Sequence, residues 1–328
     1  MERMRAGIVV GPGQVVCDEA DFVEPGVEDV VVRSQLTSIC GSDLHLIYNP
    51  WPNQVYPAPP GFPGHEGVGV VEHSNHADFV PGDKVLTVPS AFRGTCYNEL
   101  QTLTGQRCVK LPETDVAPLH LLMAQQLGVV LFAAELQPVD LEGANVAIIG
   151  QGSAGIYFAW WAKRQGAATV IASDLSPARR AVGLQMGADI VVDGASPDNL
   201  LEAVRDVTGG QGAPMVIEAV GKASTLRQVT ELAAYDGKIL MFGLPEDDDD
   251  WPFHAYKFLR KRLQMWAGIG AQHEHGLVTF KKALRYIADG EIDMAPMVSH
   301  TIPLEDIGHA LDLAHDRTDN AIKVSISF

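Results

Sequence analysis

The sequence is poor in cysteine, and its few cysteines lie far apart. Its 328 residues include four, Cys17, Cys40, Cys96 and Cys108, and no two of them form a Cys-x-x-Cys pair. This spacing argues against a disulfide framework and against a zinc lobe held by four thiolates. A reducing compartment suits such a chain, and we expect it in the cytoplasm.

Long apolar runs are also lacking. The sequence has no 18 consecutive apolar residues, and its most apolar stretch, Ile156 to Ala162, is far too short to span a bilayer. Near the N-terminus, Ala6 to Val10 is closed by Gly11 and Pro12, which predicts a strand rather than a signal peptide. We therefore expect no membrane anchor.

Positive charge is scarce as well. Lys and Arg number 24 against 41 Asp and Glu, which gives a net charge of −17. A surface of that sign repels both a nucleic-acid backbone and an anionic bilayer. Nucleic acids and membranes are therefore not expected as partners, and a small molecule is.

The sequence is nevertheless apolar enough to form a core. Hydrophobic residues make up 46% of it, which is near the average for soluble globular proteins. A chain of 328 residues exceeds what one hydrophobic core comfortably supports. The length therefore predicts about two domains.

From about residue 145, short β-branched runs alternate with segments of helical period. The runs that predict strands are Val146–Ile149, Thr169–Ala172, Ile190–Val192, Met215–Ile217 and Lys238–Phe242. The segments that predict helices are Gly155–Gln165, Pro177–Met186, Asp198–Thr208 and Ser224–Ala234. Because a helical crossover between buried strands requires the strands to run parallel, this part is predicted to be a doubly wound α/β domain.

The flanking parts have a different pattern. Residues 1 to about 126 are rich in Gly and Pro and hold short Val-rich runs such as Val30–Val32 and Val68–Val71. This pattern predicts a compact, mostly antiparallel β domain with long loops. After about residue 270 the sequence predicts two helices and a closing strand, at Thr279–Ala288, Glu305–His315 and Lys323–Ser327.

A glycine-rich turn follows the first strand of the α/β part. Gly150-Gln151-Gly152-Ser153-Ala154-Gly155 stands between that strand and the next helix. The first glycine permits a tight turn, the second lets backbone N–H groups approach a pyrophosphate, and the third allows close contact between helix and strand. Together with the partial positive charge of the helix N-terminus, the turn predicts a dinucleotide site.

An aspartate in the same unit indicates which dinucleotide binds. Asp174 lies 19 residues after Gly155 (174 − 155), at the end of the second predicted strand. Its carboxylate can accept hydrogen bonds from both ribose hydroxyls and would repel a 2′-phosphate, so NAD is favoured over NADP. The alternative is that Asp174 only caps the helix that begins near Pro177.

The first part of the chain holds a group of potential metal ligands. Cys40-Gly41-Ser42-Asp43-Leu44-His45 is followed by Gly64-His65-Glu66. Thiolate and imidazole suit zinc, and a carboxylate can complete three protein ligands while one position stays open for water or substrate. Taken singly, Cys40 could be an inert buried thiol and His65 a hydrogen-bonded core histidine, and spacing alone does not decide.

Together these motifs resemble the medium-chain dehydrogenase/reductase family. The resemblance rests on Cys-Gly-Ser-Asp-x-His, on Gly-His-Glu, and on a glycine turn whose acid follows 24 residues beyond the first glycine (174 − 150). The polyol branch, sorbitol dehydrogenase in particular, is nearest, because Ser173–Arg179 is similar to its nucleotide loop. Val298–His300 and Ile322–Val324 resemble the family's C-terminal signatures.

The resemblance implies a fold and a function. Residues 1–126 and 271–328 would form a GroES-like, mostly β catalytic domain, and residues 127–270 a Rossmann NAD-binding domain. The implied enzyme is a zinc- and NAD-dependent oxidoreductase that interconverts an alcohol, polyol or sugar hydroxyl and a ketone, as a homodimer or homotetramer. Two alternatives are kept, a zinc-free reductase of enones or quinones and a non-catalytic NAD-binding protein.

The resemblance also implies site residues. In the catalytic domain, the zinc ligands match Cys40, His65 and Glu66, the partner of the metal histidine matches Asp43, and the proton relay matches Ser42 and His45. For the coenzyme, the matching residues are Gly150, Gly152, Ala154, Gly155, Asp174 and Arg179 at the nucleotide, Phe242, Gly243, Leu244, Gly268 and Ile269 at the nicotinamide, and Lys323 at the pyrophosphate.

The chain departs from the family pattern in two places. The four-cysteine structural zinc lobe is missing, because Gly82–Val85 runs almost directly into Gly94–Glu99, so one catalytic zinc is implied and no structural one. Counting back 24 places from Gly150 gives Gln126, where the family usually has a Cys, Glu or Asp that faces the metal. A neutral amide is a poor zinc ligand, so Glu66 or water must contribute more here.

Overall fold

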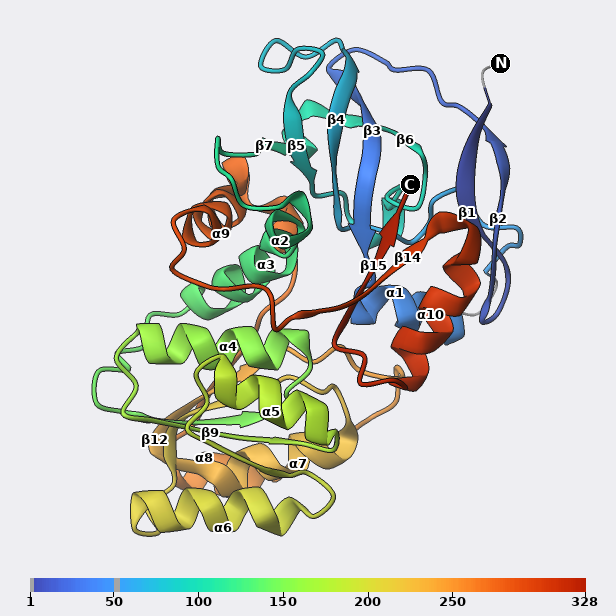
Figure 1. Ribbon diagram of the computed structural model, residues 1–328. Coiled ribbons are helices and arrows are strands. Elements are labelled where there is room, and N and C mark those ends of the chain that lie inside the picture. The colour runs from blue at the N-terminus through green and yellow to red at the C-terminus, as the bar shows by residue number, and fades with distance from the viewer. Residues whose placement is uncertain (1–2, 50–53) are drawn as a thin grey trace. The chain divides into compact units, whose positions relative to one another are not determined.

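The chain folds into two compact units (Figure 1). The computed structural model describes residues 3–49 and 54–328. Unit 1 comprises Met1–Gly128 and Ala271–Phe328, and unit 2 comprises Val129–Gly270. The chain thus leaves unit 1, forms unit 2 and then returns to finish unit 1.

Unit 1 is built on a mostly antiparallel sheet. Within the described residues it has seven strands in the order β14-β15-β3-β4-β5-β7, with β6 paired to β3. These strands are β3 (Asp29–Ser38), β4 (Gly67–Ser74), β5 (Lys84–Thr87), β6 (Leu100–Thr104), β7 (Cys108–Lys110), β14 (Val298–Pro303) and β15 (Lys323–Ser327). The pair β14 and β15 is parallel and the other pairs are antiparallel, which confirms the predicted β domain.

A hairpin and short helices complete unit 1. The hairpin consists of β1 (Arg3–Gly11) and β2 (Gln14–Asp21). The helices of the unit are α1 (Gly41–Tyr48), α2 (Pro118–Leu122), α9 (Val278–Ala288), α10 (Ile307–Asp316) and the first residues of α3 (Ala124–Glu135). The predicted C-terminal helices and strand agree with α9, α10 and β15, so local periodicity was sufficient to locate them.

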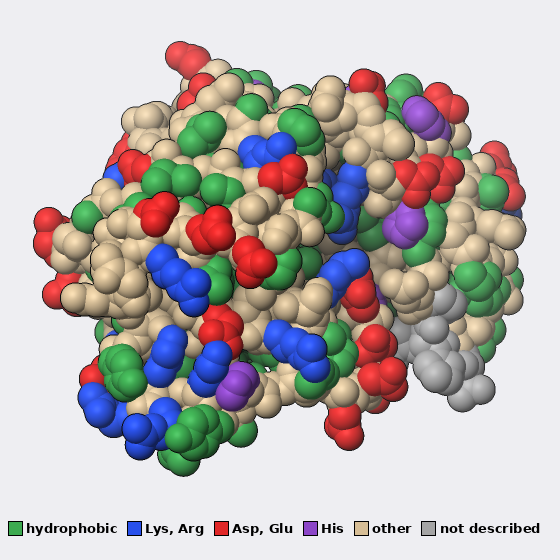
Figure 2. Space-filling model, turned by 90° about the horizontal axis from the view of Figure 1, so that it is seen from below, with side chains coloured by type: hydrophobic (Ala, Val, Ile, Leu, Met, Phe, Trp, Pro, Cys, Tyr) green, Lys and Arg blue, Asp and Glu red, His purple; other side chains and the backbone are tan. Residues whose placement is uncertain are grey.

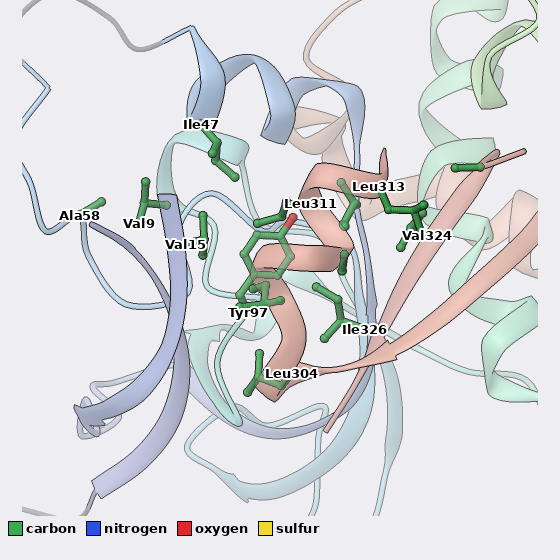
Figure 3. Packing of buried hydrophobic residues seen from close by; sticks show 14 residues of the cluster. Val9, Val15, Ile47, Ala58, Tyr97, Leu304, Leu311, Leu313, Val324 and Ile326 are labelled. Carbon is green, nitrogen blue, oxygen red and sulfur yellow. The ribbon is translucent and has the colours of Figure 1, made fainter. Parts of the chain in front are cut away.

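One apolar cluster joins segments of unit 1 that are far apart in the sequence (Figure 3). It combines Val9 and Val15 of the hairpin with Tyr97 from a loop, Leu311 of α10 and Ile326 of β15, all of them buried. Removing this much apolar surface from water is the main favourable term in folding. The cluster therefore fixes the C-terminal segment against the N-terminal hairpin.

Unit 2 is a doubly wound parallel sheet, as predicted. Its strand order is β10-β9-β8-β11-β12-β13, and every pair is parallel. The strands are β8 (Asn145–Ile149), β9 (Thr169–Asp174), β10 (Ile190–Asp193), β11 (Ala213–Glu218), β12 (Ala233–Met241) and β13 (Gln264–Ala267). The strand order reverses beside β8, and open α/β sheets bind ligands at the carboxyl ends of strands at such a switch point.

The helices of unit 2 begin and end where local chemistry dictates. They are α4 (Ser153–Arg164), α5 (Pro177–Gln185), α6 (Pro197–Thr208), α7 (Ala223–Leu232) and α8 (Ala255–Arg260). Ser176 and Ser196 cap α5 and α6, and each is followed by a proline at the first helical position. Gly209 ends α6 in the left-handed conformation, with φ of 59°.

Two elements of unit 2 differ from the prediction. The predicted helix Ser224–Ala234 ends earlier, because Ala233 and Ala234 already belong to β12. Strand β13 was not predicted at all. It is an edge strand with mostly exposed side chains, so its sequence lacks the continuous apolar run that marks a buried strand.

One helical stretch of the described chain, Pro118–Glu135, has the length and apolar composition of a membrane-crossing helix. Its mean hydropathy is 1.2, and 67% of it is buried inside the structure. Leu122, Leu127 and Leu131 are fully buried. Core helices with this burial meet the same criteria of length and composition.

The acidic excess is not spread evenly over the surface. Figure 2 shows one face of the molecule, on which basic side chains gather toward one edge and acidic ones lie between and beside them. The net charge of −17 therefore does not describe each part of the surface.

The buried cluster of unit 1 yields a stability prediction. Leu311 is fully buried within it, so Leu311→Ala removes apolar contacts and leaves a cavity. We expect the free energy of unfolding to fall by about 2 to 5 kcal/mol, measured by urea denaturation followed by circular dichroism. Val27→Ala is the control, because that side chain is 88% exposed, and an equal loss in both variants would contradict the prediction.

Candidate metal centre and dinucleotide site

Three potential metal ligands converge in unit 1. Cys40 precedes α1, and His65 and Glu66 lie directly before β4. One potential ligand atom from each residue lies within 4.8 Å of the other two, a thiol sulfur, an imidazole nitrogen and a carboxylate oxygen. His65 is 3% exposed, Glu66 is 1% exposed and Cys40 is partly buried. The fold therefore brings the three predicted ligands together.

The carboxylate of Asp43 orients the imidazole of His65. Asp43 is fully buried in the first turn of α1, and its Oδ1 lies 2.7 Å from His65 Nδ1. Because an ionised carboxylate can only accept, Nδ1 must carry the proton and donate it. The other nitrogen, Nε2, is then the one that can offer its lone pair to a metal ion once it has lost its proton. The backbone N–H of Cys40 donates to Asp43 Oδ2 at 3.0 Å, so Asp43 links both residues.

The charge of Asp43 also controls the protonation of His65. Burial alone would lower the pKa of His65, but the charge and the hydrogen bond of Asp43 outweigh burial. The pKa of His65 therefore lies well above its usual value. The same carboxylate strengthens the basicity of Nε2 toward a Lewis acid, which is the usual role of an acid behind a metal-binding histidine.

Glu66 has one oxygen engaged and one without a partner. Its Oε2 lies 2.5 Å from Lys323 Nζ and accepts a hydrogen bond from the hydroxyl of Ser38. Burial alone would raise the pKa of Glu66, but the positive charges at Lys323 and His65 outweigh it and hold the pKa below its usual value. Its Oε1 is buried and has no hydrogen-bond partner among the described residues. That oxygen is available as a ligand atom.

Lys323 has a contact that the family pattern did not predict. The family pattern placed this residue at the pyrophosphate of the coenzyme. In the structure Lys323 belongs to β15 of unit 1, is 1% exposed and forms an ion pair with Glu66. A buried ammonium that is paired in this way balances the charge of the carboxylate, and its expected contact with a coenzyme stays a prediction.

The predicted relay residues both lie on α1. Ser42 Oγ lies 3.3 Å from Cys40 Sγ and 3.4 Å from His65 Nε2, so its hydroxyl stands beside two of the potential ligand atoms. His45 follows three residues later, one turn along the same helix, and is partly exposed. The helix thus brings Ser42 to the ligand atoms, while His45 stays partly exposed.

Several described residues that the sequence motifs did not predict also contact this centre. The hydroxyl of Ser38 donates to Glu66, the amide of Gln125 donates to the carbonyl of His65 at 3.1 Å, and the hydroxyl of Tyr97 donates to Asp43 at 2.8 Å. Gln125 could have been noticed as a polar residue in the apolar stretch Leu121–Val130. No local sequence pattern distinguishes Ser38 or Tyr97 as part of a site.

Gln126, the residue found by counting back from the glycine turn, is also buried. It is 7% exposed, and its Oε1 has no hydrogen-bond partner among the described residues. Its neighbour Gln125 contacts the backbone of His65. A buried acceptor without a donor is costly, so this oxygen is unusual for a protein interior.

The glycine turn of unit 2 has the geometry that its sequence predicted. Gly150 has φ of 94°, a conformation that side chains disfavour, and Gly152 is the N-cap residue of α4. A Cβ on Gly155 would lie 2.0 Å from the carbonyl oxygen of Gly150, so only glycine lets the helix approach the turn. Ala154 lies inside the first turn. No side chain caps α4, which leaves backbone N–H groups for an anion.

Asp174 ends β9 beside this turn. Its Oδ2 accepts from the backbone N–H of Gln151 at 2.8 Å, and its Oδ1 accepts from the backbone N–H of Ser176 at 2.8 Å. The capping alternative for Asp174 is wrong, because the N-cap residue of α5 is Ser176. Arg179 Nη1 lies 4.0 Å from the position of a Cβ on Gly152, which places this guanidinium next to the turn.

A second carboxylate, that of Glu218, holds neighbouring loops in place. It ends β11, is fully buried, and accepts from the backbone N–H groups of Val220 at 2.9 Å and Gly221 at 3.0 Å and from the hydroxyl of Thr225 at 2.8 Å. Burial outweighs these bonds and raises the pKa of Glu218. Its role was not predicted, although an acid at the end of a buried strand repeats the pattern of Asp174.

The predicted nicotinamide segments follow β12 and β13. Phe242, Gly243 and Leu244 come directly after β12, and a Cβ on Gly243 would lie 2.1 Å from the backbone nitrogen of Gly221. Gly268 and Ile269 come directly after β13. Leu244 is 41% exposed and Ile269 is 73% exposed. Both segments therefore lie at the carboxyl edge of the sheet, where a coenzyme would bind.

Two family models match the chain. The model of the zinc-binding dehydrogenases matches residues 154–288, and the model of the alcohol dehydrogenase GroES-like domain matches residues 26–122. Together they confirm the expected fold, a GroES-like domain combined with a Rossmann domain.

Similar proteins and solved structures cover nearly the whole chain. An alcohol dehydrogenase of Cupriavidus necator is 25% identical over 98% of each chain, and an L-threonine 3-dehydrogenase of Bacillus velezensis is 29% identical over 87% of this chain and 88% of the relative. Among solved structures, an alcohol dehydrogenase from Thermus sp. ATN1 is 27% identical, with 99% of each chain covered and a TM-score of 0.82. The L-idonate 5-dehydrogenase of Escherichia coli has a TM-score of 0.83 over 100% of this chain and 99% of that chain, and its 23% identity shows a shared fold.

Proposed function

Because the chain belongs to the zinc-dependent medium-chain dehydrogenases/reductases, we propose that it is an NAD-dependent alcohol or polyol dehydrogenase. The reaction converts a secondary alcohol and NAD to a ketone, NADH and a proton, and it is reversible. The observation that carries the proposal is the convergence of Cys40, His65 and Glu66, with Ser42 beside them. Binding of NAD alone would require none of these residues.

The donor set fits a zinc ion. Thiolate, imidazole and carboxylate are its usual protein ligands, and three of them leave one position for a substrate. Because His65 Nδ1 is bonded to Asp43, Nε2 is the nitrogen that faces the other potential ligand atoms, beside Ser42 Oγ. Glu66 Oε1 is buried without a partner among the described residues. When bound, zinc would act as a Lewis acid that lowers the pKa of a substrate hydroxyl.

The protein's own residues would then bind the substrate and move its proton. Ser42 Oγ lies beside the ligand atoms, where it can accept the proton of a substrate hydroxyl while its own proton passes toward His45. His45 lies one turn further along α1 and is partly exposed, so its imidazole can pass a proton to solvent. Asp43 keeps His65 in one tautomer throughout. When bound, NAD would supply the nicotinamide that accepts a hydride from the substrate carbon.

The finer features of the proposal follow from particular residues. The absence of a Cys-x-x-Cys pair supports a single zinc per chain. Similarity of Ser173–Arg179 to the polyol branch supports a polyol or sugar substrate. Four free cysteines suit a reducing cytoplasm. A homodimer or homotetramer is proposed from family resemblance.

Metal content and turnover test the proposal. We expect one zinc per chain by elemental analysis and NAD reduction with at least one alcohol, polyol or sugar in a spectrophotometric screen. Cys40→Ser should lose zinc and turnover but keep NAD binding, because the glycine turn belongs to the other unit. Zinc should also be lost as pH falls. Because the pKa of His65 is raised, protons should begin to compete with zinc for this histidine at a higher pH than for an ordinary histidine.

The control for this experiment is Cys17→Ser, a partly buried cysteine remote in sequence from the ligand motif. It should keep zinc and turnover. Two zincs per chain would contradict the single-site proposal. A protein without zinc that reduces activated double bonds would instead support the zinc-free reductase.

Asp174 should set the coenzyme preference. Its carboxylate is fixed by two backbone N–H groups and keeps further lone pairs for ribose hydroxyls, so we expect NAD to bind at least about tenfold more tightly than NADP. Asp174→Ala should narrow this ratio, chiefly by weakening NAD, as measured by fluorescence titration. Asp193→Ala, at the end of the neighbouring strand β10, is the matched control. Equal or tighter binding of NADP by the wild type would refute the assignment.

Gln126 should tune the metal centre. If its buried amide faces the zinc, Gln126→Glu restores the negative charge that is usual in the family. We expect slower zinc loss to a chelator and a pH–rate profile shifted to higher pH, because added negative charge opposes deprotonation of a substrate hydroxyl. Gln125→Glu is the comparison, because its side chain faces the carbonyl of His65 and should not improve retention. No change in either quantity would show that Gln126 does not face the metal.

A further inference from the structure

Tyr97 lies at the junction of the apolar cluster and the candidate metal centre. It is fully buried and belongs to the cluster shown in Figure 3, where its oxygen is the only polar side-chain atom among the residues drawn. Its backbone is fixed by a bond from Gly7 N–H at 2.8 Å and a bond to the carbonyl of Gly61 at 3.3 Å. A Cβ on Gly64 would lie 2.8 Å from the ring, so the ring packs directly against the residue before His65.

The single polar atom of the Tyr97 side chain points at Asp43. Its hydroxyl donates to Asp43 Oδ2 at 2.8 Å, the oxygen that also accepts from the backbone N–H of Cys40 at 3.0 Å. Asp43 Oδ1 faces His65 Nδ1 at 2.7 Å. Burial and the charge of Asp43 raise the pKa of Tyr97 well above its usual value, so the phenol stays protonated and remains a donor.

We propose that Tyr97 is a positioning residue of the metal centre, which holds the carboxylate of Asp43 in the plane that His65 requires. A carboxylate turns easily about its last bond unless donors fix both oxygens. Here one donor on Oδ1 and two on Oδ2 determine the plane, and one of those two is a side chain anchored in the core. The chain of bonds from Tyr97 through Asp43 to His65 thereby connects a metal ligand to the packed interior.

Filling space does not account for the hydroxyl of Tyr97. The other buried members of the cluster are aliphatic, and a buried hydroxyl in such surroundings is costly unless it is bonded. A phenylalanine would fill the same volume without that cost. The hydroxyl therefore acts through Asp43, and this role rests on the proposed zinc site.

The test is Tyr97→Phe, which keeps the ring and removes only the donor. We expect zinc to be lost to a chelator about tenfold faster or more, the range seen when partners of metal-binding histidines are removed. The visible spectrum of the cobalt-substituted protein should change, because it reports ligand geometry. NAD affinity should stay within error, and the thermal unfolding midpoint of the metal-free protein should fall only by the few degrees that the loss of one buried hydrogen bond costs.

Tyr56→Phe is the matched control. Tyr56 packs against the same cluster, and its hydroxyl is buried without a hydrogen-bond partner among the described residues. It should leave zinc retention and the cobalt spectrum unchanged. If Tyr97→Phe behaved like Tyr56→Phe, the proposal would be overturned. It would also be overturned if faster zinc loss were accompanied by a loss of folded structure in circular dichroism.

A double-mutant cycle with Asp43→Asn shows whether Tyr97 acts through Asp43. In that background the hydroxyl no longer faces a carboxylate, so Tyr97→Phe should change cobalt affinity much less than it does in the wild type. Additive effects would overturn the proposal. A wild type that binds neither zinc nor cobalt would refute the proposed function itself, whereas normal metal binding with an unaffected Tyr97→Phe variant would refute only this inference.

Discussion

The candidate metal centre depends on one buried carboxylate, that of Asp43. It accepts hydrogen bonds from the backbone of Cys40, the ring of His65 and the hydroxyl of Tyr97. A fully buried negative charge is tolerated only where such donors compensate for the lost water. Asp43 therefore joins α1, the turn before β4 and the loop before β6, and the separation of the potential ligand atoms depends on that junction.

Unit 2 uses carboxylates in a related way, with a different result. Asp174 and Glu218 each end a parallel strand and accept backbone N–H groups from loops at that edge of the sheet. Loops rich in glycine have few side chains with which to fix themselves, so an acid at the strand end supplies the missing contacts. Glu218 is fully buried and devoted to this task, whereas Asp174 is partly exposed and can also accept hydrogen bonds from a ligand.

Features that depend on interactions between neighbouring residues could be predicted from the sequence. Turn glycines, caps and apolar runs act over a few residues, so the glycine turn Gly150–Gly155 and most strands and helices of unit 2 could be located. Contacts between residues far apart in the sequence could not be predicted in this way, because no local pattern marks them. Glu66 meets Lys323 only because of the register of β15, and Tyr97 meets Asp43 across 54 positions of sequence. The family pattern assigned Lys323 a role at the coenzyme, which stays a prediction, and gave no indication of its ion pair with Glu66.

The pairing of Glu66 with Lys323 has a consequence for how the protein is made. Glu66 belongs to the first segment of unit 1, and Lys323 belongs to β15, which is translated only after all of unit 2. Domains generally fold as units while the chain emerges from the ribosome. Unit 2 can therefore fold while Glu66 still lacks its ion pair with Lys323. The candidate metal centre is completed only when β15 leaves the ribosome.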